Sequence, residues 1–183
     1  MTKAYRPRED SLLLRDVVEP ISANLALEIG CGVGFVLESL AQRCAFVVGV
    51  DVDKSSLSQA KLRLKAKGLT NFELLCASSA EPFISEVFDL IVFNPPYLPS
   101  LTIEDRAVDG GYRGVEVSLQ WLKECKRVVK VDGKVLFISS SLASQDELIK
   151  GAEALRFKIK LVDSKHLFYE DLYAYELTFG YDV

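Results

Sequence analysis

The sequence predicts a single doubly wound α/β domain, in which helices cover both faces of a mostly parallel sheet. Short apolar runs alternate along the chain with segments of helical periodicity. Several runs are almost continuously apolar, as in strands that are buried on both faces. The length of 183 residues suits one domain, and a content of 49% hydrophobic and 26% charged residues is typical of a globular protein. We therefore expect residues 1–183 to form one domain.

The first half of the chain predicts helices and strands in alternation. Apolar spacing favours a helix over Glu9–Val18, so residues 1–20 are interpreted as an N-terminal helical segment. A strand at Leu25–Ile29 leads through a glycine-rich turn into a second helical pattern. A further strand at Ala45–Val50 precedes a helix over Ser55–Lys67, which Gly68 is suited to end.

The second half continues the alternation and ends in two strands with no helix between them. Helical spacing of apolar residues is found from Val115 to Val129, and Ser144-Gln145-Asp146-Glu147 has the pattern of a capping box that opens a helix. Two final strands in succession allow antiparallel pairing at the end of the sheet. The strands expected here are Phe72–Cys76, Phe88–Phe93, Lys134–Ser139, Phe157–Val162 and Leu172–Phe179.

Composition and patterning exclude several classes of protein. The longest stretch without a charged residue or histidine, Leu90–Ile103, has 14 residues and contains prolines, so it cannot span a bilayer as a helix. No secretory signal is recognisable at the N-terminus, and we expect a cytoplasmic protein. The net charge of −4 disfavours nucleic acid as a partner. Four widely spaced cysteines and a single histidine predict free thiols and no metal site.

A glycine-rich turn after the first predicted strand reads Glu28-x-Gly30-x-Gly32-x-Gly34. Glycines allow a ligand to approach the backbone closely, and the helix that follows offers unpaired N–H groups. The Glu28 carboxylate suits the cationic end of a ligand. The third glycine comes one residue too early for the G-x-G-x-x-G dinucleotide fingerprint, which disfavours NAD.

An acidic residue, Asp51, ends the second predicted strand. A carboxylate at this position can accept hydrogen bonds from both hydroxyls of a ribose. Together with the glycine turn, it indicates a nucleoside ligand. The alternative is a tight strand-to-helix turn in which Asp53 or Ser55 caps the next helix.

The sharper signal is Asn94-Pro95-Pro96-Tyr97, directly after a buried strand. Two successive prolines fix φ and remove N–H donors, which leaves a stiff loop of acceptors. The Asn94 side-chain oxygen and the Pro95 carbonyl can each accept one N–H of an amide or exocyclic amine, holding its lone pair toward an electrophile. Tyr97 could stack on the flat group that is held. The alternative is a loop that only ends the strand.

These motifs resemble those of class I S-adenosylmethionine-dependent methyltransferases that modify amide or exocyclic amino nitrogens. The resemblance covers nearly the whole chain. It implies a Rossmann-like, mostly parallel seven-stranded sheet with one antiparallel C-terminal strand. Two further motifs are similar to those of HemK-like release-factor glutamine methyltransferases, in particular their short archaeal and eukaryotic branch: Tyr5-Arg6-Pro7-Arg8-Glu9-Asp10-Ser11 and Asp109-Gly110-Gly111-x-x-Gly114-x-x-Val117.

The resemblance also implies roles for single residues. The segment 1–20 would pack over the cofactor site and place Ser11 near the methionine end of S-adenosylmethionine. Ser78 stands where the family often has an acidic residue near the adenine. Glu28 and Gly30 would contact the methionine moiety, and Asp51 would hold the ribose. Asn94 and Pro95 would hold the target amide. The remaining implied site residues are Gly32, Gly34 and Asn94 for the cofactor, and Pro96 and Tyr97, with Asn94 and Pro95, for catalysis.

The function implied is N5-methylation of the glutamine in the Gly-Gly-Gln loop of a class 1 peptide-release factor. Methylation of adenine N6 or guanine N2 in nucleic acid, or of a protein lysine, is the alternative. A non-catalytic regulatory subunit is disfavoured because the Asn-Pro-Pro-Tyr motif is intact. The resemblance further implies a small zinc-binding activator protein, bound where Phe72–Cys76 forms the border of the sheet. His166 and Trp121 are interpreted as a surface residue and a core residue.

Overall fold

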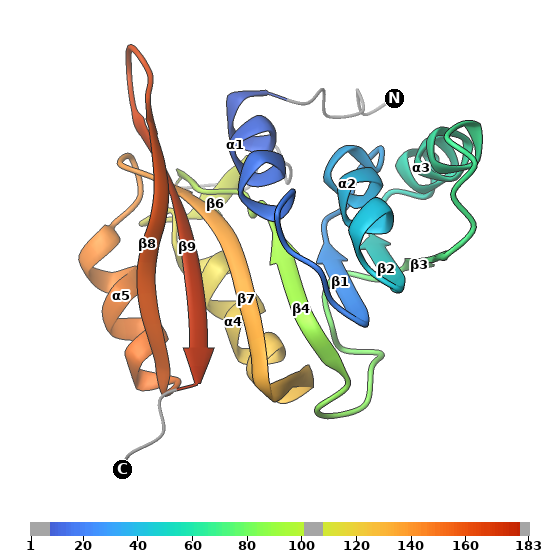
Figure 1. The fold of residues 1–183 in the computed structure, drawn as a ribbon. Coiled ribbons are helices and arrows are strands. Elements are labelled where there is room, and N and C mark those ends of the chain that lie inside the picture. Colours follow the sequence, from blue (N-terminus) through green and yellow to red (C-terminus); the bar gives the residue numbers. More distant parts are fainter. Residues whose placement is uncertain (1–7, 101–107, 180–183) are drawn as a thin grey trace.

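The computed structural model describes residues 8–100 and 108–179 and shows a three-layer α/β arrangement (Figure 1). Within these residues a seven-stranded sheet has the order β3-β2-β1-β4-β7-β9-β8, and β9 alone runs antiparallel to its neighbours. The strands of this sheet are β1 Leu25–Ile29, β2 Phe46–Asp51, β3 Phe72–Cys76, β4 Phe88–Phe93, β7 Val129–Ser140, β8 Phe157–His166 and β9 Asp171–Phe179. The helices are α1 Glu9–Val18, α2 Phe35–Arg43, α3 Lys54–Ala66, α4 Glu116–Val128 and α5 Gln145–Ala154.

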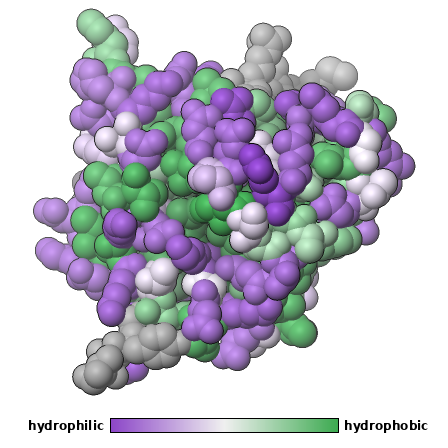
Figure 2. Space-filling model, in the orientation of Figure 1, coloured by the Kyte–Doolittle hydropathy of each residue, from purple (hydrophilic) through white to green (hydrophobic). Residues whose placement is uncertain are grey.

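Each face of the sheet carries its own hydrophobic core. Successive strand residues point to opposite faces, so Leu90 and Val92 join the core beneath α1, α2 and α3, whereas Ile91 and Phe93 join the core beneath α4 and α5. Figure 1 shows the two helical layers on either side of the sheet. The outer surface over α1–α3 is mostly hydrophilic, with smaller hydrophobic groups between (Figure 2). The predicted doubly wound architecture is confirmed.

The centre of the sheet brings two loops together. β1 lies between β2 and β4 and is parallel to both. Strands β2 and β3 are added on one side of β1 and the later strands on its other side, so the order of strand addition reverses next to β1. Ile29 and Phe93, the last residues of β1 and β4, are paired in register. The loops that begin at Gly30 and Asn94 therefore leave the sheet side by side, at the carboxyl ends of the strands where doubly wound proteins bind their ligands.

Most predicted elements are observed with boundaries within a few residues of those expected. The helix over Glu9–Val18 and the strands at Leu25–Ile29, Phe72–Cys76 and Phe88–Phe93 have the predicted bounds. The last strands pair antiparallel, and β3 is at the border of the sheet as expected. Among the described residues, no helix is long and apolar enough to cross a membrane.

Two local predictions were wrong. Val129 was assigned to a helix but begins β7, which is six residues longer than the predicted strand and starts with a register shift against β4. Ser144 is the N-cap residue of α5, but its side chain makes no cap hydrogen bond. Its N–H instead donates to the Arg113 carbonyl, and the Glu147 carboxylate forms an ion pair with the Arg113 guanidinium, so the expected capping box is not made.

Candidate active site

The glycine turn between β1 and α2 is built from left-handed backbone conformations. Gly30, Gly32 and Gly34 have φ values of 70°, 50° and 76°. A Cβ at Gly30 would lie 3.2 Å from the Trp121 ring, and one at Gly34 would lie 3.0 Å from the Ala60 Cβ. At Gly32 no atom lies within 4 Å of that position, so this residue faces open space. The turn thus packs tightly on both sides and leaves its middle residue free to approach a ligand.

Asp51, the last residue of β2, faces the glycine turn. Its Oδ2 accepts a hydrogen bond from the Gly32 N–H at 2.8 Å, and its Oδ1 accepts one from the Asp53 N–H at 2.8 Å. Each carboxylate oxygen has a second acceptor site, so both can still receive a hydroxyl donor. Asp53 caps α3 by accepting bonds from the Ser55 and Ser56 N–H groups, as the structural alternative had predicted. Because Asp53 caps α3, Asp51 is not needed as the helix cap and can take part in the site.

Glu28 is a buried acid without a full set of partners. The residue is 5% exposed, and its Oε2 has no hydrogen-bond partner among the residues that the structure describes. Burial raises the pKa of Glu28 well above its ordinary value, the nearby charge of Asp51 raises it further, and a hydrogen bond from the Leu37 backbone offsets part of this effect. A protonated Glu28 would ionise if a cation took the place opposite Oε2. The side chain is therefore suited to a positively charged ligand group.

The segment Asn94–Tyr97, here called the Asn-Pro loop, begins where β4 ends. Pro95 is buried, and the Asn94 Oδ1 is a buried acceptor with no hydrogen-bond partner among the described residues. A buried amide oxygen without a partner costs free energy, about 1–3 kcal/mol. Such a cost is recovered when a ligand N–H fills the position. The loop therefore offers a buried acceptor to a donor group.

A short second sheet braces the Asn-Pro loop. β5 Leu98–Pro99 pairs in parallel with β6 Asp109–Gly111, a pairing that the sequence had not indicated. A Cβ at Gly110 would lie 2.7 Å from the Pro96 carbonyl oxygen, and one at Gly114 would lie 2.3 Å from the Tyr97 carbonyl oxygen. Only glycine fits this close backbone approach. The Asp109–Gly114 stretch thus holds the loop in position.

Helix α1 contributes Asp10 and Ser11, both buried. The Asp10 Oδ1 accepts a hydrogen bond from the Ser11 N–H at 2.6 Å, and the Asp10 Oδ2 accepts one from the Tyr97 hydroxyl at 3.2 Å. The helix is therefore joined to the Asn-Pro loop. The first residues of the Tyr5–Ser11 motif, up to Pro7, lie outside the described residues.

The other residues noted in the sequence have packing or surface positions. Trp121 packs edge-on against Phe93, with ring centroids 5.6 Å apart, directly behind the glycine turn. His166 is 84% exposed and pairs with Asp171, so it is a surface residue as expected. All four cysteines are free thiols. In the part of the chain that the structure describes, no group of three His, Cys, Asp or Glu side chains is placed to hold a metal ion.

The region beyond β3 contains two groups that sequence reasoning missed. Ser78 is exposed and its hydroxyl lies 3.3 Å from the Glu81 carboxylate, so an acid is present three residues after the position where the family often has one. The Ser79 hydroxyl is buried without a hydrogen-bond partner among the described residues. Neither feature has a signal in the local sequence, because both depend on how the chain turns after Cys76.

Comparisons with known proteins identify the family of this chain. A family model described as a methyltransferase domain matches residues 26–133. A Methanocaldococcus jannaschii protein, which its name proposes to be a protein N5-glutamine methyltransferase, is 32% identical over 93% of this chain and 89% of its own length. The Enterococcus faecalis release factor glutamine methyltransferase is 27% identical over 72% of this chain. The match covers 52% of that relative, so the chain spans about half its length.

The fold is also shared with solved structures. The E. cuniculi Mtq2–Trm112 complex, described as responsible for methylation of the eRF1 translation termination factor, superimposes with a TM-score of 0.81. The match covers 96% of this chain and 98% of that one at 23% sequence identity. At this level of identity the likeness demonstrates a common fold.

Proposed function

This chain belongs to the methyltransferase family and is an N-methyltransferase of its HemK-like branch, and we propose that it methylates the side-chain amide nitrogen of a glutamine in a peptide-release factor. The observation that carries the proposal is the buried, unpartnered Asn94 Oδ1 beside the glycine turn. The glutamine in question would be that of the Gly-Gly-Gln loop of a class 1 release factor.

The residues around the glycine turn fit S-adenosylmethionine as the methyl donor. Glu28 would take the ammonium group, which a buried acid with a free oxygen can stabilise by ionising. The open position at Gly32 leaves room for the ligand, and Asp51 would accept the ribose hydroxyls. Ser11 would lie near the methionine end of the methyl donor, and Ser78 would lie near its adenine. When bound, this donor supplies an electrophilic methyl group on a positively charged sulfur.

The Asn-Pro loop would hold the target amide. Asn94 Oδ1 and the Pro95 carbonyl oxygen would each accept one of the two N–H groups of the glutamine side chain. Hydrogen bonds to both N–H groups increase electron density on the nitrogen, whose lone pair is otherwise shared with its carbonyl. The loop also fixes the nitrogen in line with the methyl group, which lowers the entropic cost of reaching the transition state. After transfer the nitrogen keeps one of its protons and releases the other to water.

The same two acceptors could hold the exocyclic amine of a nucleobase, which is the alternative substrate. The net charge of −4 supports a protein over a polyanion. A protein lysine would also meet these acceptors.

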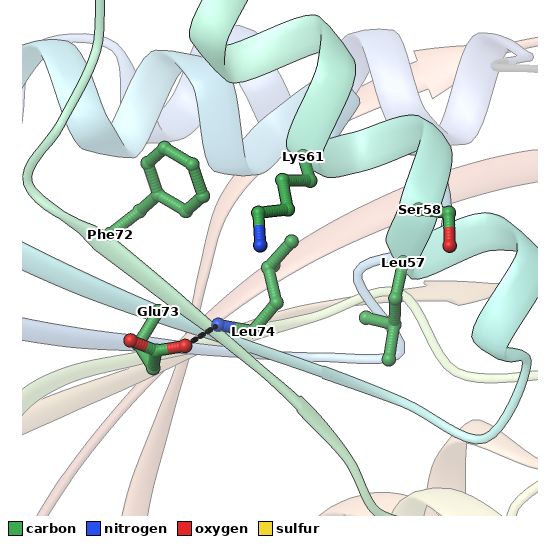
Figure 3. A pocket seen from close by; sticks show the side chains of 6 residues that line it. All are labelled: Leu57, Ser58, Lys61, Phe72, Glu73 and Leu74. Carbon is green, nitrogen blue, oxygen red and sulfur yellow. Dashed lines mark hydrogen bonds between the residues drawn. The ribbon is translucent and has the colours of Figure 1, made fainter.

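We also propose an activator protein at the β3 border of the sheet. In the described part of the chain β3 pairs only with β2, so its other edge is open to a further strand. A hollow between α3 and β3 is lined by Leu57, Ser58, Lys61, Phe72, Glu73 and Leu74 (Figure 3). Leu75, on the other side of the strand, is 38% exposed. The E. cuniculi relative is found in a complex with Trm112, which supports a partner of this kind.

The function is tested by transfer of a labelled methyl group from S-adenosylmethionine. The acceptors compared are a class 1 release factor, DNA, RNA and histone-like peptides. We expect label on the release factor and none above background on the others. Label on DNA or RNA with an unmodified release factor would contradict the proposal and favour the nucleobase alternative.

A further inference from the structure

An exposed apolar strip lies on the same face of the molecule as the Asn-Pro loop. It consists of Tyr112, Leu142, Phe168 and Tyr169, which are 68%, 46%, 88% and 84% exposed. Phe168 and Tyr169 form the tip of the β8–β9 hairpin, where their rings meet edge-on with centroids 4.6 Å apart. Large apolar side chains gathered on one exposed face often mark a binding surface.

Hydrogen bonds of neighbouring residues connect the segments that carry the strip. Leu142 directly follows Ser141, whose N–H donates to the Asp171 carbonyl and whose hydroxyl accepts from the Asp171 N–H. These bonds join Leu142 to the base of the hairpin. At the other end, the Ser144 N–H donates to the carbonyl of Arg113, the residue after Tyr112. The segments that carry the strip are therefore joined to one another along the ends of β7 and β9.

The strip begins next to the candidate active site. Tyr112 lies between Gly111 and Gly114, in the stretch that packs against Tyr97. β7, which leads to Leu142, is the neighbour of β4, which leads to Asn94. Figure 1 shows the β8–β9 hairpin extending past the other strands on the side to which β1, β2 and β4 point. The strip thus leads outward from the acceptor that would hold the target amide.

The hairpin that carries the aromatic tip is anchored. The Glu170 carboxylate accepts a hydrogen bond from the Ser140 hydroxyl at 2.5 Å, and Lys165 forms an ion pair with Glu9 of α1. The tip itself is closed by a 2.8 Å bond from the Leu167 N–H to the Glu170 carbonyl. An anchored hairpin loses little conformational freedom when a partner binds, so its two rings are well placed to contribute affinity.

Charges beside the strip are largely neutralised by pairing. The cations Arg113 and Lys165 form ion pairs with Glu147 and Glu9. A surface whose cations are paired attracts a phosphate backbone only weakly, and its apolar side chains match those of a polypeptide. The charge pattern therefore favours a protein occupant over a nucleic acid.

We propose that this strip docks the protein substrate, holding the folded domain that carries the target glutamine loop while the loop reaches Asn94. This inference rests on the proposed function and adds to it the surface that recognises the substrate. Recognition outside the reacting group would make a whole protein a better substrate than a short peptide.

The test uses the full chain with the variants Phe168→Ala and Tyr169→Ala, singly and together. Ile84→Ala is the matched control, because Ile84 is 75% exposed but lies before β4, at the opposite end of that strand from Asn94. Binding of a class 1 release factor is measured by calorimetry, and methylation is measured on the release factor and on a short Gly-Gly-Gln peptide.

We expect the double variant to bind the release factor ~10-fold or more weakly than wild type, because two aromatic contacts are lost. It should methylate the short peptide at the wild-type rate. The control should match wild type in both assays. Unchanged binding by the double variant, or no binding by wild type, would overturn the docking proposal. Binding that depends on the tip without any methylation would instead leave docking supported and refute the proposed function.

Discussion

The hydroxyl of Tyr97 donates a hydrogen bond to the Oδ2 of Asp10 at 3.2 Å, and this bond joins the Asn-Pro loop to the first helix across 87 positions of sequence. On its other side the same loop packs against Gly110 and Gly114, with no space for a larger residue. The acceptor at Asn94 is therefore held from two directions. A stiff loop of this kind keeps its acceptors in place before the substrate arrives.

Gly114→Ala should displace the Asn-Pro loop, because the added Cβ would lie 2.3 Å from the Tyr97 carbonyl oxygen. We expect the methylation rate to fall by ~10- to 100-fold, as for a misplaced catalytic group, with cofactor affinity within a fewfold of wild type. Gly68→Ala is the matched control: both glycines have φ of 73°, but Gly68 has no atom within 4 Å of its Cβ position. Equal losses of rate in both variants would point to backbone strain alone.

Glu28→Gln should change the pH dependence of stability. The pKa of Glu28 is raised in the folded protein, so the native state binds more protons than the unfolded state as pH rises from about 4.5 toward the folded pKa. Wild-type stability therefore falls with rising pH through this window, by at most ~1.4 kcal/mol per pH unit, and the glutamine variant lacks this loss. Urea denaturation from pH 5 to 8 measures the difference, with exposed Glu73→Gln as control.

The same variant should bind S-adenosylmethionine more weakly, because it cannot ionise opposite the ammonium group. We expect a loss of ~10-fold or more in affinity, as for a charge-assisted hydrogen bond. Calorimetry that shows a more stable protein with undiminished cofactor affinity would separate Glu28 from the cofactor site.

Asp51→Ala should weaken cofactor binding by ~10- to 100-fold, or ~1.5–3 kcal/mol, through loss of charge-assisted bonds to the ribose. Asp53→Ala is the matched comparison, since Asp53 caps α3 instead of facing the site. We expect that variant to be less stable, because it lacks the helix cap, with unchanged affinity. If calorimetry on folded Asp51→Ala gives wild-type affinity, Asp51 does not hold the ribose.

Leu75→Lys should weaken association with an activator, because it places a charge at the exposed border of the sheet. Leu62→Lys is the matched control, since Leu62 is 70% exposed on α3. Leu74 is a poorer test because it packs against the core beneath α3. We expect co-purification with the activator to be lost in the first variant and kept in the second; retention in both would place the partner elsewhere.

The sequence predicted the elements that depend on local pattern. Apolar runs and helical spacing are local, so the seven strands of the main sheet and the helix at Glu9–Val18 could be predicted. β5 and β6 could not, because they are two and three residues long, contain proline or glycine, and pair with each other although they are not adjacent in sequence.

The candidate site was predictable to a similar extent. Glu28, Asp51 and Asn94 stand at strand ends, and a parallel sheet brings such ends together, so their grouping follows from sequence. The unpaired oxygen of Glu28 depends on burial in three dimensions and had no signal in the sequence. The contact between Gly114 and Tyr97 depends in the same way on two loops that meet only in the folded chain.

Mass spectrometry of a class 1 release factor after incubation with S-adenosylmethionine and this protein tests the central claim most directly. We expect a gain of about 14 Da, one methyl group in place of a hydrogen, on the glutamine of the Gly-Gly-Gln loop, absent when that glutamine is changed to asparagine. With Asn94→Ala the rate should fall by ~100- to 1000-fold, as for loss of one preorganised polar contact. An unmodified glutamine with wild-type protein, or an undiminished rate with the variant, would contradict the account.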